Sequence, residues 1–97
     1  MPTIILKYAI QQLQEMKNPS FVIIEDAKKA IVDFAESVEE ANSKCMLADS
    51  HGVKCTFYES SLETVEKLRE GTKNADLDPL KGDSIIIPNF DFNFSQE

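Results

Sequence analysis

The stretch FVIIEDAKKAIVDFAESVEEANSKC, residues 21–45, decides how this chain folds. Its apolar side chains recur at alternating steps of three and four residues, which is the spacing of one helix face. These residues are Ile24, Ala27, Ile31, Phe34, Val38, Ala41 and Cys45. The stripe covers about three heptads and predicts one long helix of roughly 25 residues. A second interpretation makes residues 21–24 a short buried strand and begins the helix at Asp26, because periodicity cannot assign a short apolar run.

A shorter amphipathic pattern precedes this stretch. Its apolar positions are again three or four residues apart, with glutamine and glutamate between them. They are Leu6, Ala9, Ile10, Leu13 and Met16. The pattern predicts a helix of about four turns that ends near Lys17. Asn18 and Pro19 suit the N-cap and the first position of a following helix, so the long helix is expected to begin after almost no loop.

After the long helix the pattern changes to that of a β-hairpin. Residues 44–48 and 53–58 flank Asp49-Ser50-His51-Gly52. Aspartate at the first position and glycine at the fourth position of this tetrapeptide favour a turn. We therefore expect two antiparallel strands joined by that turn.

The last predicted elements are a short helix and a strand. Ser60 and Glu63 have the spacing of a capping box, which opens a helix that ends near Gly71. Residues 84–87 predict a strand up to Pro88, which removes a ladder donor.

The expected fold is therefore α+β. Two N-terminal helices, the second one long, are expected to pack on a small antiparallel sheet made of the hairpin and the C-terminal strand. We expect a single domain over residues 1–88 and an aromatic and acidic tail over residues 89–97, because a chain of 97 residues leaves no room for a second core. The expected core is Leu6, Ile10, Leu13, Ile31, Phe34, Val38, Leu47, Val53, Phe57, Leu62, Val65, Leu68 and Ile86.

Composition excludes several classes of function. The chain has 17 acidic and 10 basic residues and a net charge of -7, so its field repels phosphate backbones and anionic lipid surfaces. No apolar run approaches the roughly 20 residues that span a bilayer, and no signal-peptide pattern is present. Two cysteines are too few for a secreted disulfide scaffold. We expect a cytoplasmic protein that binds neither nucleic acid nor membranes directly.

The sequence carries no diagnostic catalytic or metal motif. Cys45, Asp49, His51 and Cys55 form the only thiol and imidazole cluster, which lacks the paired ligands of a zinc site. Residues 74–78 resemble the start of a calcium loop, but Pro79 and Ile85 stand where that loop needs glycine and glutamate. We expect no cofactor, no metal and no enzymatic activity. An enzyme or metal site built on Cys55 and His51 is a third hypothesis, after the two functions considered below.

Two features could bind a partner. The first is the polar face of the predicted long helix, whose carboxylates are Asp33, Glu36, Glu39 and Glu40. The second is the tail, in which Phe90, Phe92 and Phe94 alternate with polar residues and share one face of an extended segment. The plainer interpretations are a solvated helix face and a terminal strand laid on the protein's own core.

These features favour an acidic adaptor or inhibitor that binds a larger, basic protein. A row of carboxylates on a helix could imitate a phosphate backbone, as an antagonist encoded by a mobile element would. The long apolar stripe and the open tail also favour a homodimer. The alternative function is a homo-oligomer that binds a small molecule in a pocket at the subunit interface.

Overall fold

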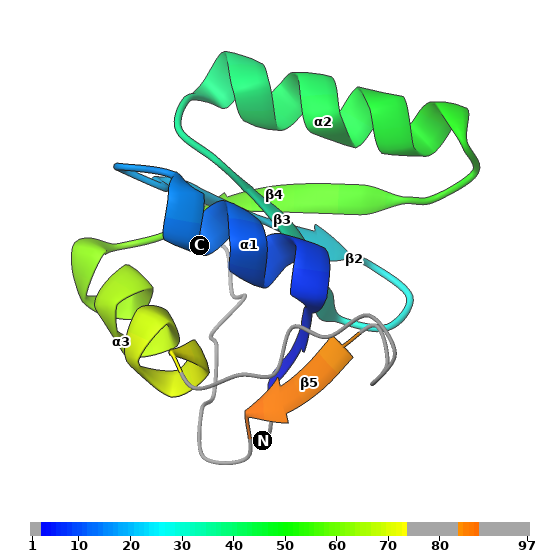
Figure 1. Cartoon of the computed structure of the whole chain (residues 1–97). Coiled ribbons are helices and arrows are strands. Elements are labelled where there is room, and N and C mark those ends of the chain that lie inside the picture. Colours follow the sequence, from blue (N-terminus) through cyan, green and yellow to red (C-terminus); the bar gives the residue numbers. More distant parts are fainter. Residues whose placement is uncertain (1–2, 74–83, 88–97) are drawn as a thin grey trace.

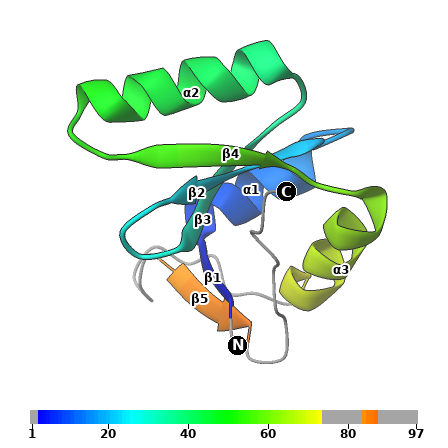
Figure 2. The same cartoon turned by 180° about the vertical axis from the view of Figure 1, so that it is seen from behind.

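The structure is a computed structural model that describes residues 3–73 and 84–87. A mixed sheet of five strands carries helices on both faces (Figures 1 and 2). Helix α2 lies over one face, and α1 and α3 lie on the other. In chain order the elements are β1 (Thr3–Leu6), α1 (Lys7–Glu15), β2 (Phe21–Glu25), β3 (Ala30–Ala35), α2 (Val38–Ser50), β4 (Cys55–Glu59), α3 (Leu62–Thr72) and β5 (Ser84–Ile87).

The strands are ordered β4-β2-β3-β1-β5 across the sheet. β2 pairs antiparallel with both β3 and β4, and β1 pairs antiparallel with β5. The central pair, β1 and β3, is parallel, with Ile4 opposite Ala30 and Ile5 opposite Ile31. A parallel pair needs a long crossover, which α1 and the β2 hairpin strand supply here.

The prediction of one long helix over residues 21–45 is wrong. Residues 21–35 form the β2–β3 hairpin, and only the end of the stretch is helical, in α2. The second interpretation was right to make residues 21–24 a strand, but it was wrong to begin a helix at Asp26, which lies in the hairpin turn. The runs FVII and AIVDF are rich in β-branched and aromatic residues, which favour strands over helices.

The predicted hairpin over residues 44–58 is also wrong in its first arm. Residues 44–48 belong to α2, and the sequence Asp49–Gly52 ends that helix. Gly52 has a φ of 82°, the left-handed conformation that commonly follows a helix C-terminus. The second arm is a strand as expected, but it pairs with β2 and not with residues 44–48. The sheet is therefore mixed and five-stranded, where a small antiparallel sheet was expected, although the class is still α+β.

Helices α1 and α3 and strand β5 lie where the sequence predicts two helices and a strand. The N-cap of α3 is Ser61, one residue later than predicted, and its hydroxyl accepts from the Thr64 N–H at 3.1 Å. Ser60 is buried instead and donates its hydroxyl to the Pro19 carbonyl. Strand β1 was not predicted, because the sequence analysis assigned Leu6 to the first helix.

The core has two parts, one on each face of the sheet. The larger cluster lies between the sheet and helices α1 and α3, and the smaller one lies under α2. Ile10, Leu13, Ile31, Phe34, Val65 and Leu68 are buried as expected. Five expected core residues are exposed: Val38, Leu47, Val53, Leu62 and Ile86. They had been assigned to a fold in which a long helix packed on a hairpin, and that packing does not exist.

Candidate functional site

The four predicted carboxylates do not form a row along a helix. Asp33 lies on β3, Glu36 lies in the connection that follows, and Glu39 and Glu40 lie in the first turn of α2. The single long helix on which the imitation of a phosphate backbone depended is therefore not formed. The fold instead brings Glu36 and Glu40 together at the corner where β3 leads into α2, and Lys44 links Glu40 to Asp33.

A β-bulge in β3 directs Asp33 toward α2. Ile23 pairs with Asp33 and Ile24 pairs with Ile31, so Val32 is an extra residue in the ladder. The Asp33 carboxylate contacts the Lys44 ammonium of α2 at 3.2 Å and accepts from the Phe34 N–H at 2.7 Å. Burial nevertheless raises the pKa of Asp33, because desolvation outweighs the hydrogen bond and the lysine.

The start of α2 fixes the Glu40 carboxylate. The Ser37 hydroxyl caps the helix by accepting from the Glu40 N–H at 3.1 Å. The Glu40 side chain reaches back and accepts from the Glu36 N–H at 2.9 Å. This hydrogen bond, and then Lys44 at 3.3 Å, lower the pKa of Glu40, so the carboxylate stays ionised at neutral pH.

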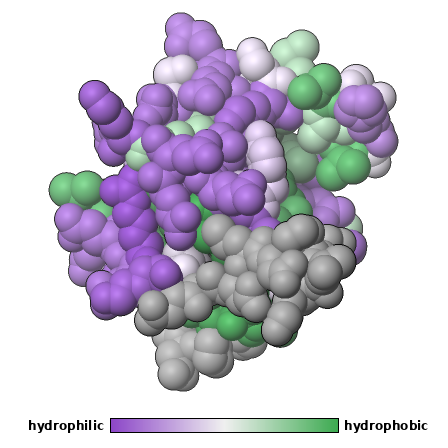
Figure 3. Space-filling model, in the orientation of Figure 1, coloured by the Kyte–Doolittle hydropathy of each residue, from purple (hydrophilic) through white to green (hydrophobic). Residues whose placement is uncertain are grey.

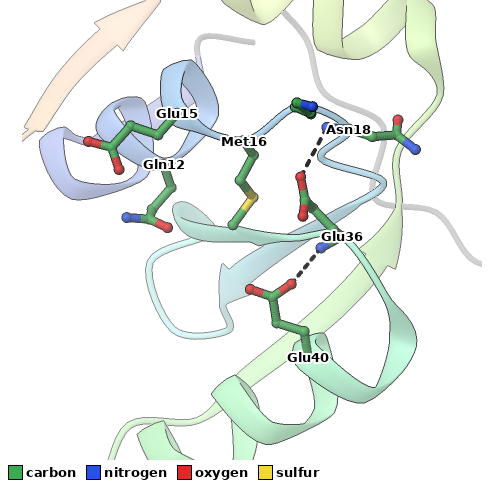
Figure 4. Close-up of a pocket in the computed structure, with 7 residues that line it drawn as sticks. Gln12, Glu15, Met16, Asn18, Glu36 and Glu40 are labelled. Atoms are coloured by element: carbon green, nitrogen blue, oxygen red, sulfur yellow. Dashed lines mark hydrogen bonds between the residues drawn. The ribbon is translucent and has the colours of Figure 1, made fainter.

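A groove of about 660 Å³ opens between this corner and the end of α1 (Figure 4). Glu36 and Glu40 lie on one side, Gln12 lies on the other, and the Met16 side chain lies between them. We call this the carboxylate groove; its lining residues are Gln12, Glu15, Met16, Lys17, Asn18, Glu36 and Glu40. Three of these residues are carboxylates and one is a lysine, so the lining carries an excess of negative charge.

Backbone contacts hold the two sides of the groove together. The Asn18 N–H donates to the Glu36 carboxylate at 3.1 Å, which ties the α1–β2 connection to the β3–α2 connection. Arg69 of α3 donates to the carbonyls of Leu13 and Met16, the closer at 2.7 Å. These bonds use carbonyls at the C-terminus of α1 that have no partner within the helix, and they position Met16.

The structure places His51 and Cys55 along one groove beneath the end of α2, but neither cysteine is set up as a nucleophile. Cys45 and Cys55 are free and half-buried, and both pack against the small cluster under α2. Burial raises the pKa of both thiols, and nearby carboxylates add to this effect, so neither resembles an activated thiolate. Among residues 3–73 and 84–87, no three His, Cys, Asp or Glu side chains are grouped to hold a metal ion.

Several predicted features lie outside the described residues: Phe90, Phe92 and Phe94 of the tail, and the loop of residues 74–78. Met16 and Asn18 also line the groove, although the sequence pattern did not mark them as site residues. No sequence signal pairs them with Glu36, because the fold joins segments 18 residues apart. One available signal was overlooked: Ser37 and Glu40 have the spacing of a capping box and mark where a helix begins.

Comparison with known proteins adds no relative. No family model, curated protein or solved structure matches the chain. Within the described ranges, no helix has the length and apolar character needed to cross a membrane.

Proposed function

We propose that this chain is a non-catalytic protein-binding module whose carboxylate groove takes a basic segment of a larger partner protein. The observation that carries this proposal is the pair Glu36 and Glu40. Each carboxylate is oriented by a backbone N–H, and both face a groove that Met16 floors. Such an arrangement suits a lysine or arginine side chain, which has an apolar stem and a cationic end.

A single basic side chain can contact both the apolar part and the acidic part of the groove. Its methylene stem would pack on Met16, which is half-buried, while its cationic group would contact Glu36 and Glu40. Arginine fits better than lysine, since its planar guanidinium can bond two carboxylates at once. Lys44 already neutralises one oxygen of Glu40, and the oxygen that accepts from Glu36 is the other one. Glu36 has no such internal cation among the ion pairs of the described residues.

Two further properties support a basic partner. The low pKa of Glu40 keeps this carboxylate charged over the whole neutral range. The net charge of -7 attracts cationic surfaces over a longer range and speeds their encounter at low ionic strength. Because the carboxylates are held before a partner arrives, binding costs little ordering of side chains on this chain.

The test is a binding titration with a defined probe. The probe is a fluorescein-labelled peptide of alternating arginine and glycine, and fluorescence anisotropy reports its Kd for the full chain. We expect Glu36→Gln with Glu40→Gln to weaken binding about tenfold, because two partly exposed ion pairs of up to ~1 kcal/mol each are lost. Glutamine keeps the acceptor oxygens for the two backbone N–H groups, so the fold should persist.

The matched control removes two carboxylates elsewhere. Glu39 and Glu63 lie in the first turns of α2 and α3, and neither lines the carboxylate groove. The double change Glu39→Gln and Glu63→Gln alters net charge by the same amount, and it should leave the Kd within about twofold, because both side chains are exposed to solvent and their charges are screened. Equal losses in the two double variants would show that only net charge matters and would reject the groove as the site.

A further inference from the structure

A second groove, of about 670 Å³, lies under the C-terminal half of α2. Its apolar lining comes from four parts of the chain: β1, α1, β3 and the end of α2 with the residues after it. We call it the apolar groove, and its apolar residues are Leu6, Tyr8, Val32, Leu47, Ala48 and Val53. Figure 3 shows apolar atoms, in green, gathered at the right-hand end of the molecule where α2 ends.

Large apolar side chains around this groove are left open to solvent. Tyr8 is 54% exposed, Leu47 is 63% exposed and Val53 is 38% exposed. Contiguous exposed apolar surface of this kind marks interaction sites more often than single exposed side chains do.

The pleat of the sheet extends the same surface onto β1 and β5. Ile5 and Ile85 pair with each other and pack in the core beside α1, so their neighbours Ile4 and Ile86 point to the other face. Ile86 is exposed. The face that carries the apolar groove therefore continues along the sheet, past the strands on which α2 packs.

The charges around the apolar groove are balanced, unlike those of the chain as a whole. Asp33 and Lys44 are mostly buried and neutralise each other. The charges left for a partner are Glu25, at the end of β2, and Lys28, in the hairpin turn that follows. A basic partner would meet Lys28 here, and an acidic partner would meet Glu25.

We propose that the apolar groove is the interface of a homodimer. A twofold axis brings the same mixed charges from the second copy, so that Glu25 of each chain can face a lysine of the other. At the carboxylate groove, by contrast, two copies would repel each other. The homodimer uses a different surface from the partner-binding groove and stands independently of that function.

The experiment measures the mass of the full chain by sedimentation equilibrium over a range of micromolar concentrations, in reducing buffer so that the free thiols stay reduced. We expect a dimer whose dissociation constant stays level or falls as salt increases. Salt screens the repulsion between two chains of net charge -7, and this outweighs the few partly exposed Glu25–lysine pairs that salt weakens. Leu47→Glu should raise the dissociation constant about 30-fold, as truncation of a central apolar anchor does. Tyr8→Glu places a charge on the α1 side of the same groove and should also raise the dissociation constant.

The matched control is Leu62→Glu. Leu62 is 69% exposed on α3 and does not line the apolar groove, so this variant should dimerise like the wild type. A wild type that stays monomeric overturns the proposal, and so does equal weakening by Leu62→Glu and Leu47→Glu. Peptide binding that is lost at high salt while the dimer persists separates this interface from the carboxylate groove.

Discussion

Replacing Lys29 by glycine tests the hairpin that overturned the long-helix prediction. Lys29 ends the β2–β3 turn with a φ of 56°, and its N–H donates to the Glu25 carbonyl at 2.8 Å. A non-glycine residue in this left-handed conformation costs about 1–2 kcal/mol. Glycine avoids that cost, but it loses about 0.5–1 kcal/mol through the greater freedom of the unfolded chain. We expect Lys29→Gly to raise the free energy of unfolding by about 0.5–1 kcal/mol.

The neighbouring residue Ala27 supplies the control. It is exposed in the same turn, and its φ is not positive. Ala27→Gly should therefore lower the free energy of unfolding by about 0.5–1 kcal/mol. Urea unfolding followed by circular dichroism should separate the two variants by on the order of 1 M in midpoint. A helix through this segment would make both glycines destabilising by about 1 kcal/mol, and that result would refute the hairpin.

Three further changes test contacts around the carboxylate groove. Ser37→Ala removes the N-cap of α2 and should lower the free energy of unfolding by about 1 kcal/mol in urea titrations. An unchanged free energy of unfolding would show that this hydrogen bond does not stabilise the fold. Arg69→Met leaves the carbonyls of Leu13 and Met16 without their charged donor and should cost about 1.5–3 kcal/mol by the same assay, whereas a smaller loss would mean that water replaces the guanidinium. Burial raises the pKa of Asp33 in the folded state, so the folded chain holds this proton more tightly and loses stability as pH rises between the unfolded and folded pKa values. Asp33→Asn should remove that loss, so its stability relative to the wild type should improve as the pH rises above 3.8, the ordinary pKa of this carboxyl, and a difference that does not change with pH would contradict the assignment.

The long-helix prediction failed because a bulged strand imitates helical spacing. In a regular strand, residues on one face are two apart, but the extra residue Val32 places Ile31 and Phe34 on the same face three apart. Ile24 lies on the same face in the other strand of the hairpin, seven residues before Ile31, and this separation fits a heptad. Only Val38, Ala41 and Cys45, which lie in α2, owe their spacing to a helix.

Local sequence patterns predicted an element correctly where the residues of that element alone determine its structure. The apolar spacing of Ala9, Ile10 and Leu13 predicted α1, and these side chains are buried. The carboxylate groove could not be predicted from local patterns, because Asn18 and Glu36 meet only through the pairing of the strands that lie between them in the sequence. Glu36 and Glu40 are among the four carboxylates singled out from the sequence, but no sequence pattern pairs them with Asn18 and Met16.

The measurement that tests the central claim most directly is a titration of the arginine–glycine peptide into the full chain labelled with ¹⁵N. The N–H groups of Asn18 and Glu36 donate to the two carboxylates for which the peptide competes. We predict that these two amide signals shift most, while those of Glu39 and Glu63 stay in place. Shifts spread evenly over the acidic surface, or largest outside the carboxylate groove, would contradict the account.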